Sequence, residues 1–332
     1  MKVKVAAIQP RAYRWKEEYK NVELAIKYMD EATRLGAKLI SFPEGYPGPC
    51  NGPLDFGGNL SFDPLEKICE KAKEHEAYVC ISDLEENSEM ENTYYLTLKL
   101  ISPNGKILAN YKRVQPDHQY LNAHLHGGRM HVVPGNEIEV VKTKIGNIGL
   151  QICSEIFVPE ISRVQMLMGA EIILAPVNGH HAVTHFDWPN KIKTWQAIAR
   201  ARAAENLLYV VITQNLFLEN QKGVGIIAGP EEALAQSTKQ GIITATLDME
   251  RLEMLRSRYY DAELLSPVRD PEESLKIKCR PGQIHDRRPD LYRLLVEPQP
   301  DAFNYFYYKK GLDTWKEEFE KVKEWKKNAK PH

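Results

Sequence analysis

The chain has 332 residues, with 44 lysines and arginines against 45 aspartates and glutamates, and a formal net charge of −1. This balance lacks the basic excess of proteins that bind nucleic acid or anionic membranes, so neither partner is predicted. No apolar run approaches the roughly 20 residues that span a bilayer, and the start at Met1 becomes polar too quickly for a signal peptide.

Strand and helix patterns alternate through the first part of the chain. Alternating apolar residues predict a strand over 2–9, and helical spacing from Val22 to Ala32 predicts a helix that stops at Gly36. A strand over 37–42, a helix over 65–72 and a strand over 77–82 follow. The turn at 103–105 contains Asn-Gly, which is typical of a hairpin and joins expected strands over 92–101 and 106–111.

The second part repeats the pattern. Strands are expected over 139–142, 147–152, 171–176, 207–213, 224–228 and 242–247, with helices that open at Pro159 and cover 194–205. Alternation over about 290 residues without a linker predicts one α/β domain, with helices outside and strands inside. Beyond it, the tail from residue 296 to 332 holds a charged helix over 315–327 with an aromatic stripe, which we interpret as a docking arm because the aromatic residues need cover; the alternative is a solvated helix.

Cys153 lies where a strand pattern stops, and Pro159 then opens a helix. This order predicts a strand-to-helix elbow at the rim of the sheet, where ligands bind in open α/β sheets. The alternative is that Cys153 is a small buried hydrophobic residue. Five cysteines, an odd number without a Cys-x-x-Cys pair, argue against disulfides and zinc. We therefore expect free thiols, a cytoplasmic location, no metal and no cofactor.

Two other expected strand ends also carry a reactive group. Glu44 follows the strand over 37–42, and Lys112 ends the strand over 106–111. Each residue alone is typical of a solvated surface group. Together with Cys153 they supply a base, a cation and a nucleophile, the set that covalent hydrolysis of a resistant bond requires.

These residues stand in motifs that resemble the nitrilase, or carbon–nitrogen hydrolase, superfamily. The resemblance extends from Val3 to Tyr292 and is carried by Phe-Pro-Glu at 42–44, the segment 104–113, Cys-Ser-Glu at 153–155, and the segments 157–160, 169–171, 202–206 and 287–292. It implies an αββα sandwich that pairs with a second copy into αββα–αββα. It also implies a hydrolase domain over 1–295 and a tail over 296–332 that packs on a partner subunit.

The resemblance assigns roles within this set. Cys153 is the nucleophile, Glu44 the proton acceptor, and Lys112 the oxyanion stabiliser, helped by the backbone N–H of Ser154. Glu155 is interpreted as a positioning acceptor beside the elbow. The residues expected to contact substrate are Tyr46, His126, Asn178, His180, His181 and Trp188.

One feature departs from the family pattern. Most members carry a second glutamate after the lysine, yet the interval from Arg113 to Gly135 contains none. It contains several histidines instead. We expect His124 or His126 to take that position; the alternatives are a different scheme for placing the substrate and loop histidines without a catalytic role.

The sequence therefore predicts a thiol hydrolase, of the class that cleaves non-peptide C–N bonds, acting on a small linear amide or N-carbamoyl compound. A nitrilase that converts a nitrile to an acid and ammonia is the first alternative. The second, from another class, is a binding scaffold that has lost turnover, and the missing glutamate is its support. Self-association to a dimer or a larger oligomer is expected.

Overall fold

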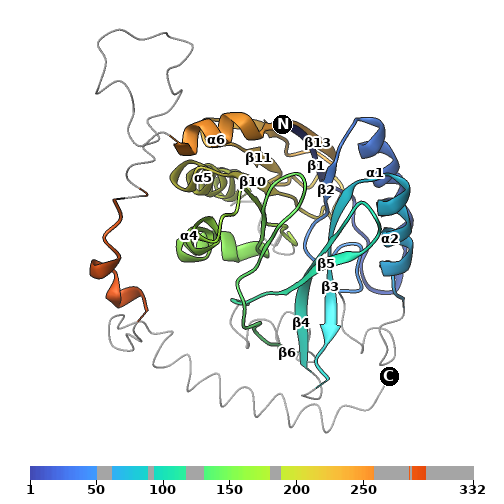
Figure 1. Ribbon diagram of the computed structural model, residues 1–332. Coiled ribbons are helices and arrows are strands. Elements are labelled where there is room, and N and C mark those ends of the chain that lie inside the picture. The colour runs from blue at the N-terminus through green and yellow to red at the C-terminus, as the bar shows by residue number, and fades with distance from the viewer. Residues whose placement is uncertain are drawn as a thin grey trace, which may run out of the picture.

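Two β-sheets packed face to face between two layers of helices form the protein (Figure 1). The computed structural model describes residues 1–50, 62–88, 93–116, 131–179, 188–257, 284 and 286–296. Apolar side chains from both sheets, among them Val5, Leu98, Ile148 and Val211, make one buried core between them. The layers therefore run helix, sheet, sheet, helix, and the predicted αββα sandwich is confirmed.

The first sheet is built around three parallel strands. Its order is β13 (Gly241–Asp248), β1 (Lys2–Gln9), β2 (Leu39–Ser41), β3 (Tyr78–Glu86), β4 (Thr93–Ile101) and β5 (Ile107–Lys112), and β6 (His131–Val132) pairs with β4. Strands β1, β2 and β3 are parallel, with Ala6 opposite Ile40 and Ile40 opposite Val79. The others pair antiparallel, apart from β6.

The second sheet also has a parallel centre. Its order is β12 (Ala233–Gln236), β11 (Ile226–Ala228), β10 (Tyr209–Ile212), β9 (Ile172–Leu174), β8 (Ile148–Leu150) and β7 (Val140–Val141). Strands β8, β9 and β10 are parallel, with Ile173 opposite both Gly149 and Val210. Parallel strands place their carboxyl ends on one edge, so the segments after β8, β9 and β10 emerge together.

Helices cover the outer face of each sheet. Helices α1 (Lys20–Arg34) and α2 (Leu65–Glu74) bury Met29 and Ile68 against the first sheet. Helices α4 (Pro159–Leu167) and α5 (Trp188–Asn206) cover the second, where Ala199 and Ala203 of α5 lie in the core. Helix α6 (Met249–Ser257) follows β13, and short 3₁₀ turns lie at Trp15–Glu17, Cys153–Phe157 (η3), Pro289–Leu291 and Arg293–Leu295.

The predicted strands and helices of the described ranges are present, with ends that differ by a few residues. Three elements were missed: β6, β12 and α6. The segment of α6 is highly charged, but Met249, Leu252 and Leu255 repeat every third residue and are buried on one face. The expected helix over 315–327 lies outside the described residues, as does the tail beyond Val296.

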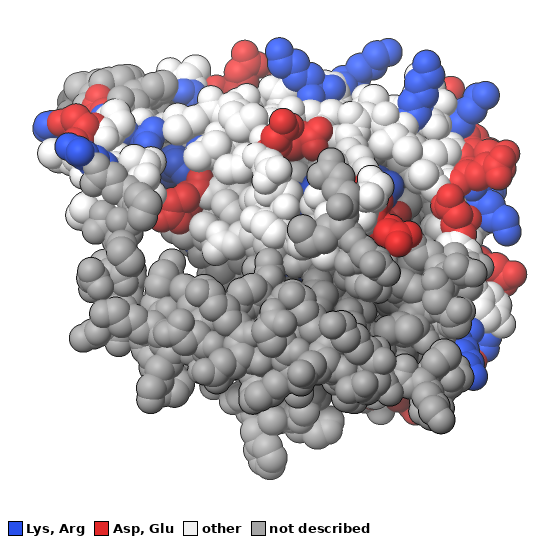
Figure 2. All heavy atoms as spheres, turned by 90° about the horizontal axis from the view of Figure 1, so that it is seen from below, with Lys and Arg blue, Asp and Glu red and all other residues white. Residues whose placement is uncertain are grey.

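The surface carries both charge signs. Figure 2 shows that lysines and arginines on the described part of one face are interspersed with aspartates and glutamates rather than gathered into a patch. Among the helices that the structure describes, none combines the length and the apolar character needed to cross a bilayer.

Candidate active site

Cys153 is the first residue of η3 and lies three residues after the end of β8. Its φ is +55°, in the left-handed region that a residue with a Cβ rarely adopts. The backbone N–H of Cys153 donates a hydrogen bond to the carbonyl of Pro176, 2.8 Å away, which ties the turn to the segment after β9. A strained turn of this kind presents a side chain at the rim of a sheet, the arrangement known as a nucleophile elbow.

Glu44 follows β2 of the first sheet but is held by the second. Its Oε2 accepts a hydrogen bond of 2.7 Å from the backbone N–H of Asn178, which follows β9. Its backbone carbonyl accepts another, of 2.8 Å, from Nδ2 of Asn215, which follows β10. The side chain is buried, with 4 % of the residue exposed. Glu44 is therefore a fixed carboxylate between the two sheets.

Arg113 joins this carboxylate to the elbow. Its Nη1 lies 3.3 Å from Glu44 Oε1, and its Nη2 donates a 2.5 Å hydrogen bond to Oγ of Ser154, the residue after Cys153. Its Nε donates to the carbonyl of Gln115 at 3.2 Å, which fixes the plane of the guanidinium. A single buried cation thus contacts both the proposed base and the neighbour of the proposed nucleophile.

Lys112 does not lie in this site. Its Nζ is 3.9 Å from the centre of the Tyr95 ring and 3.8 Å from Glu85 Oε1, and 38 % of its side chain is exposed. The reason is the alternation of side chains along a strand. Tyr111 of β5 and Arg113, the residue that follows the strand, point into the interior, whereas Lys112 between them points out. The assignment of Lys112 as the cation beside Glu44 and Cys153 disagrees with the structure.

Glu155 fastens the elbow to the segment after β5. Its carboxylate accepts hydrogen bonds from the Tyr111 hydroxyl at 2.9 and 3.0 Å and from the backbone N–H groups of Val114, Gln115 and Ile152 at 2.7 to 2.9 Å. Burial raises the pKa of this carboxyl, and the hydrogen bonds act in the opposite direction. The contacts hold the two segments that carry Arg113 and Cys153 together.

Removing this acceptor should weaken the fold. Glu155→Ala leaves four donors without their buried partner, and we expect it to lower the free energy of unfolding by about 3 kcal/mol or more. Urea denaturation monitored by circular dichroism measures the change. Glu70→Ala, on an exposed position of α2, is the matched control and should alter stability by less than about 0.5 kcal/mol. A similar small effect for both variants would contradict the fastening role.

Of the other predicted substrate contacts, the structure describes the side chains of Asn178 and Tyr46. Asn178 reaches the site through its backbone bond to Glu44. Tyr46 is fully buried in the core between α1, α2 and the first sheet, stacked on Phe42 with its hydroxyl on the carbonyl of Asn21. Trp188 opens α5, but its side chain is outside the described residues, as are His126, His180 and His181.

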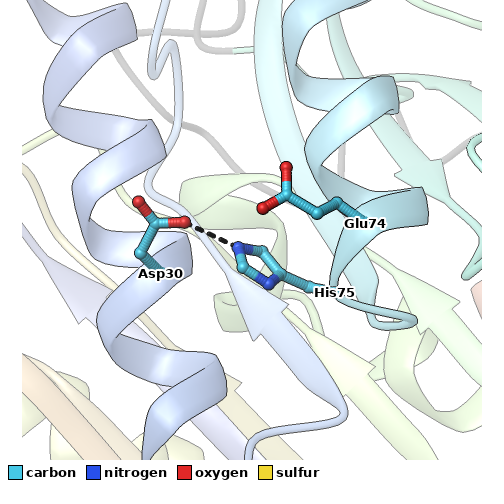
Figure 3. A group of neighbouring side chains, drawn as sticks. All are labelled: Asp30, Glu74 and His75. Atoms are coloured by element: carbon cyan, nitrogen blue, oxygen red, sulfur yellow. Dashed lines mark hydrogen bonds and ion pairs between the residues drawn. The ribbon is translucent and has the colours of Figure 1, made fainter.

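A group of potential metal ligands lies far from this site, between α1 and the end of α2. Figure 3 shows Asp30, Glu74 and His75 facing one another, with His75 Nε2 2.7 Å from Asp30 Oδ1. The ammonium of Lys71 lies 3.1 Å from Asp30 and 2.9 Å from Glu74. A divalent cation would meet this positive charge, so we interpret the group as an ion-pair cluster that joins the two helices.

Comparison with known proteins gives the family. The carbon–nitrogen hydrolase profile matches residues 4–257. A probable nitrilase of Schizosaccharomyces pombe is 24% identical over 90% of this chain and 100% of its own length, and N-carbamoylputrescine amidase of Oryza sativa subsp. japonica is 25% identical over 89% and 95%.

Solved structures agree with the fold. A mutant amidase from Nesterenkonia sp., whose active-site cysteine carries the acetamide moiety of fluoroacetamide by covalent addition, superposes with a TM-score of 0.64. The identity is 18%, and the match covers 88% of this chain and 96% of the amidase. Since the family profile spans most of the chain, this protein belongs to the carbon–nitrogen hydrolase family.

Proposed function

We propose that this protein is a cysteine-dependent hydrolase that cleaves the non-peptide C–N bond of a small linear amide or N-carbamoyl compound. The observation that carries the proposal is the position of Arg113, which contacts both Glu44 and Ser154. Support also comes from the relatives, one of which is an N-carbamoylputrescine amidase, and from the amidase with a covalently modified active-site cysteine.

In the first half of the reaction, Glu44 takes the thiol proton of Cys153 and the sulfur attacks the carbonyl carbon. The carbonyl π electrons move to oxygen as the C–S bond forms. Arg113 and the backbone N–H of Ser154 stabilise that oxyanion. When the oxyanion collapses, the C–N bond breaks, and the nitrogen leaves as ammonia or an amine with the proton from Glu44. A thioester on Cys153 remains.

In the second half, Glu44 accepts a proton from water as the water oxygen attacks the thioester carbon. Collapse of the second tetrahedral intermediate breaks the C–S bond and releases the acid, and Glu44 returns the proton to the sulfur of Cys153. Arg113 contributes charge but no proton, because a guanidinium is not deprotonated in proteins. In this scheme every proton transfer falls to Glu44.

Trapping the intermediate tests this proposal. The wild-type protein is mixed with linear amides, N-carbamoyl amines and nitriles, quenched in acid and mapped by mass spectrometry. We expect an acyl or carbamoyl adduct on the peptide that contains Cys153. Burial raises the pKa of the Cys50, Cys69 and Cys80 thiols, so these should stay unmodified. Because Cys279 lies outside the described residues, a Cys279→Ser variant serves as the control.

The mass of the adduct separates the alternatives. A nitrile leaves a thioimidate that retains its nitrogen, whereas an amide loses that nitrogen before the adduct is observed. Nitrile adducts alone would assign the nitrilase reaction. No adduct and no turnover with any compound would contradict an enzyme and favour the scaffold.

Self-association, a cytoplasmic location and the division into a domain over 1–295 and a docking tail over 296–332 are further parts of the proposal. Apolar side chains exposed on η3, on α4 and directly after α4 support self-association: Phe157, Val164, Leu167 and Met168. Leu294, Leu295 and Val296, at the boundary between the domain and the tail, are exposed as well. Sedimentation of the full chain decides the oligomeric state.

A further inference from the structure

Helix α5 is fixed against the elbow of Cys153. The Trp195 ring packs edge-to-face on Phe157 of η3, with ring centres 4.6 Å apart. Arg202 donates from Nε to the carbonyl of Ile156 at 2.9 Å and from Nη2 to that of Phe157 at 3.2 Å. These contacts come from successive turns of the helix, so the position of α5 relative to the elbow is well defined.

Lys191 lies in the first turn of this helix and is half-buried. The next residue, Ile192, is buried in the cluster that contains Ile156 and against which the Cys153 side chain packs. The Lys191 ammonium interacts electrostatically with Cys153. Burial lowers the pKa of Lys191. The negative charge of an ionised Cys153 acts in the opposite direction and raises this pKa, but burial is the larger effect. The start of α5 therefore brings a half-buried positive charge close enough to Cys153 for the two groups to interact electrostatically.

The charges around the sulfur explain what this lysine can do. Glu44 and Glu155 are two buried carboxylates, and among the described groups that contact them Arg113 is the cation. Transfer of the Cys153 proton to Glu44 would neutralise that carboxyl and place its negative charge on the sulfur, while Glu155 remains nearby. Since like charges oppose ionisation and an opposite charge favours it, a second cation in addition to Arg113 would favour the ionised sulfur.

We propose that Lys191 is a positioning residue that supplies this second cation and stabilises the Cys153 thiolate before substrate binds. Arg113 is then left to its contacts with Glu44 and Ser154. The inference rests on the proposed function, because it assumes that Cys153 is the nucleophile. It assigns the two positive charges to different tasks: Lys191 to the resting thiolate, Arg113 to the oxyanion.

The test is the pH profile of Cys153 alkylation by iodoacetamide, followed by peptide mapping of the full-length protein. In Lys191→Met the midpoint of the profile should rise by on the order of one pH unit. The alkylation rate at pH 7 should fall by about threefold, less than the loss of thiolate alone, because a more basic thiolate is more nucleophilic. Lys191→Arg, which keeps the charge, should restore the wild-type profile.

Lys193→Met is the matched control, because Lys193 is an exposed lysine two residues further along the same helix. It should leave the profile unchanged. An unchanged midpoint in Lys191→Met, or a shift that Lys191→Arg does not reverse, overturns the inference. A rise in KM with an unchanged profile also overturns it, because Lys191 would then contact substrate instead. Alkylation requires no turnover, so the inference can fail while a trapped Cys153 adduct still supports the proposed function.

Discussion

Cys153→Ala is expected to lower kcat for amide hydrolysis by about ten-thousandfold or more, to the level of the reaction without covalent catalysis. The side chain is small and lies at the rim of the sheet, so the fold should survive its truncation. Ammonia release from the best substrate of the panel measures the loss. Thermal unfolding, monitored in parallel, should give a similar Tm for the variant and the wild type.

The control for this variant is another thiol. Cys69→Ala removes a partly buried cysteine of α2, far from the elbow, and should leave kcat unchanged. If Cys153→Ala kept full activity, the thioester mechanism would be excluded. The reaction would then have to be a direct attack of water on the substrate.

Arg113→Gln is expected to lower kcat by about 100- to 1,000-fold, the usual loss when a single oxyanion donor is removed. Glutamine keeps a donor for Glu44 or Ser154 but removes the positive charge. Lys112→Gln should stay within about twofold of the wild type, because an exposed lysine paired with Glu85 at 3.8 Å contributes little. Steady-state kinetics at saturating substrate, with the Tm of each variant, distinguish the two positions.

The comparison of these two variants decides which neighbouring cation acts in the site. If Lys112→Gln reduced kcat as strongly as Arg113→Gln, the outward position of Lys112 would not be the catalytically competent one. The Arg113→Lys variant adds a further measurement. It retains the charge but loses the fork that reaches Glu44 and Ser154 together, so its kcat should lie between those of the wild type and Arg113→Gln.

The sequence predicted most of the fold because its signals are local. The apolar alternation of 2–9 and the Asn-Gly turn at 104–105 each specify a structure within a few residues. The elbow at Cys153 was predictable for the same reason, since a strand pattern ends there and Pro159 opens a helix. Helix α6 was not predicted because the charged residues in its segment outnumber the apolar residues that form its buried face.

The choice between Lys112 and Arg113 could also have been made from the sequence. Tyr111 is a large aromatic residue within a strand and marks the inward face, and residue 113 shares that face by the period of two. Lysine was favoured because the family motif contains one. Contacts between distant segments gave no such signal: Asn215 reaches Glu44 across 171 positions, and no local pattern encodes that pairing.

The groups that hold the two buried acids are in large part main-chain amides. The N–H of residue 178 donates to Glu44, and those of residues 114, 115 and 152 donate to Glu155. Every amino acid other than proline supplies a backbone N–H. The residue types at these four positions can therefore change while the hydrogen bonds to the two carboxylates remain. A search for invariant residues would thus overlook some of the positions that hold the site together. Tolerance to substitution at these positions would not show that they have no role in the site.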